Sequence, residues 1–527
     1  MNKQKLVSII LGLILVTICF LPILKSGLYS DDLQNFQLKA SLSNHSVSVY
    51  DLASKNIEKW KGFGRYTPIS LLWMECIFNY FTSIESYKFF VFIINILAVL
   101  AFLFYLHSLK LKMNYSLWLI CFASVIQYRI TYHDAYTSLN GMYQVLAICI
   151  FAGLTSYCYY ILNGKWWVLL LALLFFISSI LISEIGLMLL FLIPVSSVIL
   201  RVPLKKIIIS FIPFMTVAVC YLGYTFWLRM HVNANDSYVG LTTNMSFEAM
   251  TTLFFKQVFA AFPLTNLFQK RGLPNILFHQ LSDIRNIIGF TGIIFLSYFI
   301  YKSCKAKEFK TNLDSSYKYI LISIAFIVFP ALFILPSIKY QTEVQWGVGY
   351  LPVYFQNFGT ATFFYFIIQY GLNNYKKIFQ RISKVVFVFI VSGSCIAFLF
   401  NNALIKACTY NKSFPAQVFY DAIKSGILNE CEAGSTIILG HDFYWKSPSI
   451  YQEIFKNSTG KIFKVYDFDV KEKVDANSTC YFLDCQPGNI VYVSLYEIDK
   501  KNRLVLLMKT ETICDIEINK DENKMFH

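Results

Sequence analysis

Charged residues are scarce in this sequence. They make up only 15% of the 527 residues, whereas hydrophobic residues make up 56% and the mean hydropathy is +0.52. A soluble globular chain carries about 25% charged residues, so the composition excludes an ordinary soluble enzyme. Internal repeats and low-complexity segments are also lacking, which excludes a repeat architecture.

A cleavage site is missing after the first apolar stretch, residues 6–25. Lys3 and Lys5 precede this stretch, as basic residues precede the core of a signal peptide. Its apolar core of about 20 residues is nevertheless long enough to span a bilayer. We therefore interpret it as an uncleaved membrane anchor.

The other apolar stretches predict an all-α polytopic membrane protein. A window of span length gives about eleven transmembrane helices. Basic residues gather in the loops on one side of this map, and the positive-inside rule makes that side cytoplasmic, together with the N-terminus. The net charge of +15 is therefore mainly a topology signal and gives no reason to invoke nucleic acid. The predicted spans are 6–25, 87–109, 115–131, 141–163, 166–183, 186–201, 207–228, 287–301, 317–338, 357–374 and 383–402.

The longer segments lie on the opposite, outer side. They include a first outer loop at 27–86 and a second at 229–286. Within the first loop, the apolar stretch Gly64–Tyr80 is too short to span, so we expect a helix in the interface plane. The chain should divide into a transmembrane domain, residues 1–402, and an extracytoplasmic C-terminal domain, residues 403–527.

The C-terminal segment has a different character. Alternating and β-branched runs at 435–439, 490–493 and 504–507, with a helical pattern at 416–428, predict a small α/β domain. Five of the 13 cysteines lie in or beside it. An oxidising compartment would allow disulfides there, and Cys480–Cys485 is the closest pair in sequence, but the sequence leaves the pairing open.

Polar residues on the outer side are the candidate site. We expect them to converge around one cavity, since ionised groups at a bilayer boundary are expensive unless they have a function. Three purely structural explanations stay open. Asp31 and Asp32 would then only favour a helix start, His133 and Asp134 would form a solvated turn, and Glu184 would cap a hairpin. The candidates are Asp31, Asp32, Arg65, Arg129, His133, Asp134, Glu184, Lys339 and Glu343.

This pattern resembles the GT-C superfamily of integral membrane glycosyltransferases. The similarity rests on Asp31-Asp32 just after span one, an interfacial helix before span two, about eleven spans and an outer C-terminal domain. It covers about residues 1–402 and depends more on architecture than on motif. Within the superfamily, the serotype-converting O-antigen glucosyltransferases are the most similar in size, in the placement of the acidic pair and in the outer tail.

The resemblance implies transfer of a sugar, such as glucose, from a polyprenyl-phosphate carrier to a surface glycan such as O-antigen. The place would be the outer face of the cell inner membrane, and the other partners would be membrane lipid and a glycan or lipid-linked acceptor. One of Asp31 and Asp32 fits the base that takes the acceptor's proton. Glu184 would belong to the catalytic group, and cations would stabilise the leaving phosphate. The candidate cations are Arg65, Arg129 and Lys339, with His133 as a further one, and the in-line displacement would invert the anomeric centre.

Two other functions and one cofactor stay open. An O-antigen polymerase or ligase uses an arginine-rich outer loop, and the second outer loop contains Arg229, Lys270, Arg271 and Arg285. A transporter of lipid-linked sugars would carry charged or broken helices near the midplane, whereas the charges here collect at the outer edge. Some GT-C members bind a divalent metal, but the acidic residues of this sequence form no convincing ligand set, so we predict no cofactor.

Overall fold

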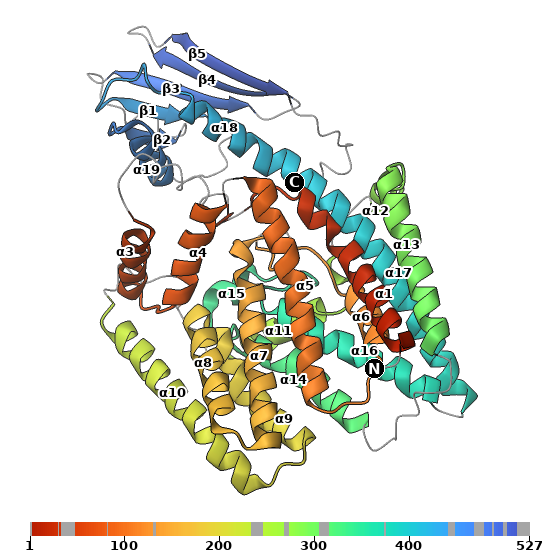
Figure 1. Ribbon diagram of the computed structural model, residues 1–527. Helices are drawn as coiled ribbons and strands as arrows, with labels where there is room; N and C mark the ends of the chain where they lie inside the picture. The colour runs from red at the N-terminus through yellow and green to blue at the C-terminus, as the bar shows by residue number, and fades with distance from the viewer. Residues whose placement is uncertain are drawn as a thin grey trace. The chain divides into compact units, whose positions relative to one another are not determined.

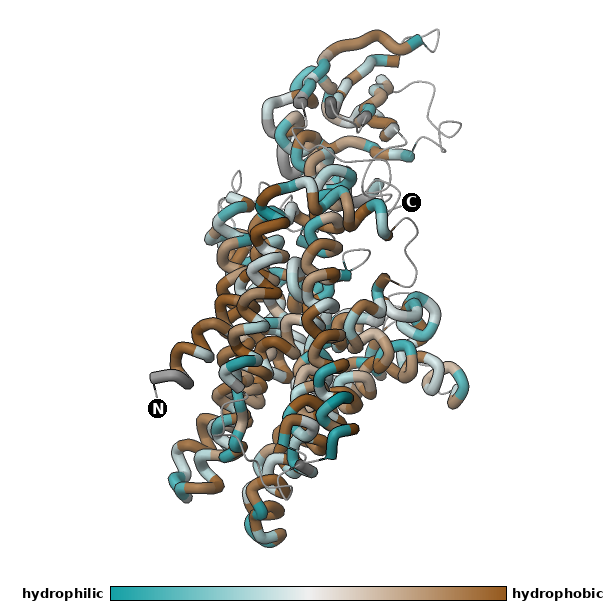
Figure 2. The backbone as a smooth tube through the Cα atoms, turned by 90° about the vertical axis from the view of Figure 1, so that its right-hand side faces the viewer, coloured by the Kyte–Doolittle hydropathy of each residue, from teal (hydrophilic) through white to brown (hydrophobic). Residues whose placement is uncertain are grey.

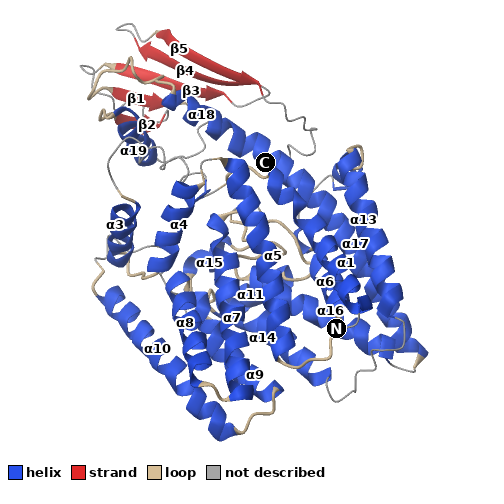
Figure 3. Ribbon diagram, viewed as in Figure 1, coloured by secondary structure: helices blue, strands red, loops and turns tan. Residues whose placement is uncertain are grey.

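The computed structural model describes residues 3–29, 31–32, 48–81, 83–129, 133–232, 246–267, 273–304, 316–373, 376–440, 448–467, 479–486, 490–498 and 503–513. These residues are mainly helical, with one small sheet near the C-terminus (Figures 1 and 3). The chain forms two compact units. The first comprises Met1–Leu24, Ala53–Met74 and Glu85–Ala403, and the second comprises Lys25–Leu52, Glu75–Ile84 and Leu404–His527.

Helices account for nearly all regular structure before residue 424. Most of them follow long runs of apolar residues, in which every backbone hydrogen bond can be made within the helix. The helices are α1 (Lys3–Phe20), α3 (Val49–Gly62), α4 (Pro68–Tyr80), α5 (Ile84–Ser108), α6 (Tyr115–Ala123), α7 (Met142–Asn163), α8 (Trp166–Ile182), α9 (Leu189–Ile199), α10 (Leu204–Met230), α11 (Phe247–Ala260), α12 (Leu273–Gln280), α13 (Ile284–Cys304), α14 (Ser316–Leu332), α15 (Ile338–Glu343), α16 (Val353–Asn373), α17 (Lys377–Cys408) and α18 (Phe414–Lys424).

Six helical segments among the described residues are long and apolar enough to cross a membrane, which indicates a membrane protein (Figure 2). The other five predicted spans coincide with helices that are shorter or less apolar, so the count of eleven is not established and stays a prediction. The predicted interfacial segment forms the short helix α4. The six segments are Leu6–Lys25, Ile84–Ser108, Leu139–Asn163, Leu204–Met230, Ile284–Ser303 and Lys377–Ile423.

The third predicted span, 115–131, is much shorter than expected. Its helix α6 ends at Ala123, and the described residues from 124 to 129 are not helical. The side chain of Asn401 on α17 accepts the N–H of Tyr128 at 3.0 Å and donates to the carbonyl oxygen of Ile126 at 2.9 Å. A buried backbone group needs a partner, and here a side chain supplies what a helix would otherwise provide.

Aromatic packing joins five helices of the first unit. The ring of Phe102 on α5 lies 4.8 Å from Phe358 on α16, 4.9 Å from Phe151 on α7 and 5.1 Å from Trp118 on α6, measured between centroids. Phe326 on α14 contacts the same ring edge-on at 5.3 Å. Such pairs contribute about 0.5–1.5 kcal/mol each beyond simple burial. This core holds the helices from which the candidate site is built.

The second unit contains a five-stranded sheet in the order β2-β1-β3-β4-β5, which confirms the predicted α/β fold. Strand β1 pairs in parallel with both β2 and β3. Strand β4 pairs antiparallel with both β3 and β5. Its buried core includes Phe419 on α18, Phe455 on α19 and Leu483 on β3. The elements are β1 (Thr436–Leu439), α19 (Pro448–Thr459), β2 (Lys464–Asp467), β3 (Cys480–Gln486), β4 (Ile490–Ile498) and β5 (Leu504–Ile513).

No disulfide joins the described cysteines of the C-terminal segment, which are Cys408, Cys431, Cys480 and Cys485. Cys514 lies outside the described residues. Cys480 and Cys485 occupy one strand, five positions apart, so they point to opposite faces of the sheet. Their closeness in sequence is therefore misleading, because an intact β3 holds the two sulfur atoms on opposite sides.

Candidate functional site

Arg65 and Glu184 form a two-point ion pair in the first unit. The Nε and Nη2 groups of Arg65 each donate to one carboxylate oxygen of Glu184, both at 3.1 Å. The side chains are 31% and 27% exposed, so water reaches the pair without fully screening it. Two parallel bonds between a planar guanidinium and a carboxylate fix the orientation of both groups. The structure thus brings together two of the predicted site residues.

Gly64 determines how Arg65 is presented. It adopts a left-handed φ of +79°, and the Arg65 N–H turns back to the carbonyl oxygen of Trp60 at 3.0 Å. A Cβ at residue 64 would lie only 3.0 Å from Val232 and 3.1 Å from the Arg229 side chain. Glycine is therefore favoured there by both conformation and space. The guanidinium lies 5.7 Å from the Trp60 ring, within cation–π range.

A tight hairpin presents Glu184. α8 ends at Ile182, and the Ser183 side chain accepts the N–H of Ile185 at 3.4 Å. Gly186 packs so closely on α8 that a Cβ there would lie 2.5 Å from a backbone atom of Ser179. The hairpin is therefore capped by Ser183. The Glu184 carboxylate accepts the two hydrogen bonds from Arg65, which the cap interpretation does not explain.

Three tyrosines and a second arginine interact electrostatically with this ion pair. Each of them acts on Arg65, on Glu184 or on both. Sequence reasoning did not select the tyrosines, because 35 tyrosines in one chain give no signal that separates these three from the rest. We call the ion pair and these four residues the Arg65 cluster. The four are Tyr143 on α7, Tyr221 and Arg229 on α10, and Tyr340 on α15.

Both members of the ion pair are charged at neutral pH. The Glu184 carboxylate raises the pKa of Arg65 above its ordinary value, despite partial burial. Burial raises the pKa of Glu184, but the charge and hydrogen bonds of Arg65 lower it by more, so that it lies below the ordinary value. An ionised, paired carboxylate is better suited to holding an arginine than to supplying a proton.

Arg129 and Asp134 are used to shape a loop. The Asp134 carboxylate accepts backbone N–H groups from Arg129, from Tyr136 at 2.6 Å and from Thr137 at 3.1 Å. Burial raises the pKa of Asp134, and these hydrogen bonds oppose that rise. The Arg129 guanidinium donates to two backbone carbonyl oxygens, at 3.0 Å and 2.7 Å. These contacts make the turn around Asp134 buried and well bonded, which differs from the open, solvated turn considered above.

A small pocket lies beside this loop. Arg129, His133, Tyr350 and Tyr354 are among its lining residues, and it has room for about one water molecule. The His133 ring packs edge-on against Tyr350 with centroids 6.1 Å apart. The pocket that these described residues line is too small for a sugar.

Lys88 was not selected from the sequence. It is fully buried on α5, and its Nζ donates to the carbonyl oxygen of Thr137 at 2.6 Å. Nearby, Asn95 donates to the Tyr136 carbonyl oxygen at 3.0 Å and accepts from Gln144 at 3.0 Å. The available signal was that Lys88 is the only Asp, Glu, Lys or Arg in the predicted span 87–109.

Four further candidates lie on α15 or in the second unit. On α15, Glu343 is exposed and Lys339 is partly buried, while Tyr340 of the same helix is the cluster member. Asp31 is exposed and Asp32 is fully buried, and both belong to the second unit. The convergence of all nine candidates on one cavity therefore stays a prediction.

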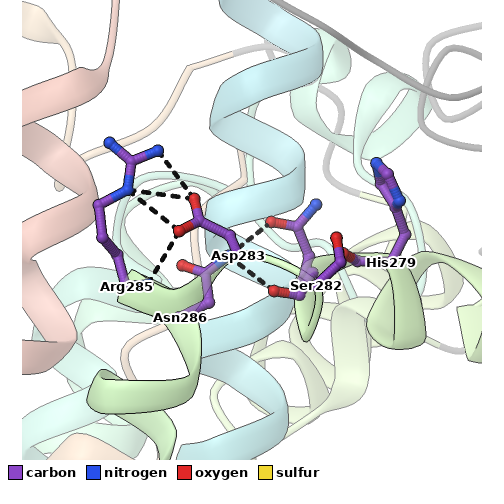
Figure 4. Close-up of polar contacts among 6 residues, drawn as sticks. His279, Ser282, Asp283, Arg285 and Asn286 are labelled. Carbon is purple, nitrogen blue, oxygen red and sulfur yellow. Dashed lines mark hydrogen bonds and ion pairs between the residues drawn. The ribbon is translucent and has the colours of Figure 1, made fainter.

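The arginines of the second outer loop have separate environments. Arg285 donates to both carboxylate oxygens of Asp283, through Nε at 3.1 and 3.2 Å and Nη2 at 2.9 Å (Figure 4). It thereby supports the start of α13, and its side chain is 70% exposed. Arg229 belongs to the Arg65 cluster, and Lys270 and Arg271 lie outside the described residues. No shared arginine site emerges from the described part of this loop.

No group of three or more His, Cys, Asp or Glu residues is placed to hold a metal ion in the described part of the chain. No protein-family model matches the sequence, and no curated protein matches it either. The resemblance to GT-C enzymes therefore stays a prediction, and function has to be argued from the residues themselves.

Proposed function

We propose that this protein is a membrane glycosyltransferase that moves a sugar from a polyprenyl-phosphate carrier to a surface glycan. The observation that carries the proposal is the Arg65 cluster. It holds an oriented guanidinium in a partly exposed ion pair, and a second arginine and three tyrosines interact electrostatically with this pair. A phosphate head group needs cations that are held in a fixed orientation.

The leaving group explains why an oriented arginine is useful. As the bond between the sugar C1 and the phosphate oxygen breaks, negative charge grows on the phosphate. A guanidinium has five N–H donors, and the described contacts of Arg65 with Glu184 use two of them. The others suit phosphate oxygens, and Arg229 adds a second positive charge. Glu184 then acts as a positioning residue, because it orients Arg65 and keeps it charged.

The acceptor side of the reaction needs a base. The acceptor hydroxyl oxygen attacks C1, the C1–O bond to phosphate breaks with its electron pair, and the hydroxyl proton passes to a carboxylate. We assign this proton to Asp31, because its side chain is exposed whereas Asp32 is fully buried. Direct displacement inverts the anomeric centre. Following the resemblance, we place the reaction at the outer face of the inner membrane, with O-antigen as the acceptor class.

The proposal is tested by the surface polysaccharide of cells with and without the gene. We expect the gene to add one sugar, in the anomeric configuration opposite to that of the donor. Asp31→Asn and Arg65→Ala should each strongly reduce the addition while the protein stays in the membrane. A polysaccharide that is the same with and without the gene, or addition at the parental level by both variants, would show that this protein is not the proposed transferase.

A further inference from the structure

The segment just before the acidic pair docks on a π-helix in the second unit. α17 continues into a π-helical turn, Thr409–Ser413, before α18 begins. The Gly27 N–H donates to Thr409 Oγ1 at 3.2 Å, and the Leu28 N–H donates to Ser413 Oγ at 2.8 Å. Two consecutive backbone groups are therefore held by two hydroxyl groups from a single turn.

The docked segment leads directly into the acidic pair. The Tyr29 hydroxyl lies 3.5 Å from Thr409 Oγ1, and the Tyr29 carbonyl oxygen accepts the N–H of Asp32 at 3.1 Å. Asp32 is fully buried, whereas Asp31 is exposed. The position of the Asp31 backbone is thus tied, through a few short hydrogen bonds, to the end of α17.

Gly27 allows the close approach. A Cβ at this position would lie 2.1 Å from Ser413 Oγ and 2.4 Å from Ser413 Cβ. Real Cβ atoms do not come this close, so a larger residue would push the segment away from the π-helix. The need here is for space, since Gly27 is not among the glycines with positive φ.

A π-helical turn is an unfavourable way to continue a helix, and such turns are found often at functional sites. We infer that Thr409 and Ser413 are positioning residues that hold Asp31 at the place where it accepts the acceptor's proton. This inference rests on the proposed function, and it gives the π-helical turn a role in positioning the base. An error of about 1 Å in the placement of a reacting group costs roughly 10²-fold in rate.

The test uses full-length protein in membranes, with matched protein levels and a panel of radiolabelled polyprenyl-phosphate hexoses as donors. Thr409→Val keeps the shape but removes the hydroxyl, and we expect kcat to fall roughly 10- to 100-fold with KM for the donor unchanged. Thr409→Ser should restore kcat. Thr459→Val, the same change on α19, is the matched control and should behave like the parent.

A second pair of variants tests the close contact. Gly27→Ala should lower kcat, and Gly27→Ala combined with Ser413→Gly should be no worse than Ser413→Gly alone, because the clash is then absent. The inference is overturned if Thr409→Val and Gly27→Ala both keep parental kcat while Asp31→Asn is inactive. It is also overturned if Thr409→Ser fails to rescue, which would indicate a general structural role. Activity in Asp31→Asn would instead refute the proposed function.

Discussion

Replacing Glu184 with glutamine tests whether transfer needs Arg65 in a fixed orientation, because the variant keeps Arg65 but weakens the ion pair that orients it. Glutamine keeps the shape and one acceptor oxygen, but its amide nitrogen faces an Arg65 donor that now has no acceptor. One of the two 3.1 Å bonds is lost together with the charge. A hydrogen bond to a charged group contributes about 1.5–3 kcal/mol, and an exposed ion pair about 0–1 kcal/mol. This pair is roughly 30% exposed, which lies between the two cases.

We therefore expect Glu184→Gln to weaken the interaction free energy between residue 184 and Arg65 by about 1–3 kcal/mol. If that orientation is needed only when charge grows on the leaving phosphate, kcat should fall roughly 5- to 150-fold, at about 1.4 kcal/mol for each factor of ten. The assay is transfer of radiolabelled sugar from a polyprenyl-phosphate donor by membranes with matched protein levels.

Glu58→Gln is the matched control for this prediction. Glu58 accepts from Lys61 at 2.6 Å one helical turn away, and its side chain is 67% exposed, so losing that pair should leave transfer unchanged. Arg65→Lys should resemble Glu184→Gln, and the double variant should lose less than the sum of the two. Parental transfer by Glu184→Gln would refute the argument that the ion pair orients a catalytic cation.

Four further outcomes can be measured. Asp31→Asn should lower transfer roughly 10²- to 10⁴-fold while the protein still inserts, because an amide is too weak a base; near-parental transfer would remove the proposed base. In protein without other accessible thiols, a cysteine placed at Lys205 should not react with a membrane-impermeant thiol reagent in intact cells, whereas one placed at Glu248 should react. Labelling at Lys205 and not at Glu248 would mean that the topology is the opposite of the predicted one. The Arg65–Glu184 ion pair lowers the pKa of Glu184, so it stabilises the folded state at pH values above the ordinary glutamate pKa of about 4.3. This stabilisation is lost as the pH falls below that value. Glu184→Gln should therefore show a smaller acid-induced drop in thermal stability than the parent, and an equal drop would contradict the shift. Arg285→Ala should leave transfer unchanged, since Arg285 is exposed and paired with Asp283, whereas a large loss would favour an arginine-rich polymerase site.

Composition and periodicity alone determined the broad class of the protein. Long apolar runs have few ways to satisfy their backbone other than as helices, so the membrane class and the positions of the apolar helices follow from hydropathy. The helices α11, α12, α15 and α19 were not predicted, because they are short and lie outside the long apolar runs. The C-terminal sheet was predictable for a similar reason, since β-branched runs such as 435–439 fit a buried strand. The length of α6 was not predictable, because the residues that follow it bond to Asn401, which lies 273 and 275 positions further along the chain.

Residue type and loop position singled out Arg65 and Glu184, but only the tertiary structure showed that they bond to each other. The same criteria selected Arg129 and Asp134, whose hydrogen-bonding groups the fold uses to shape a loop. Partners of a side chain are set by packing between segments far apart in sequence, and local patterns carry no information about that packing. For the same reason, the docking of Gly27 on Ser413, across 386 positions of chain, could be seen only once the structure had brought the two segments together.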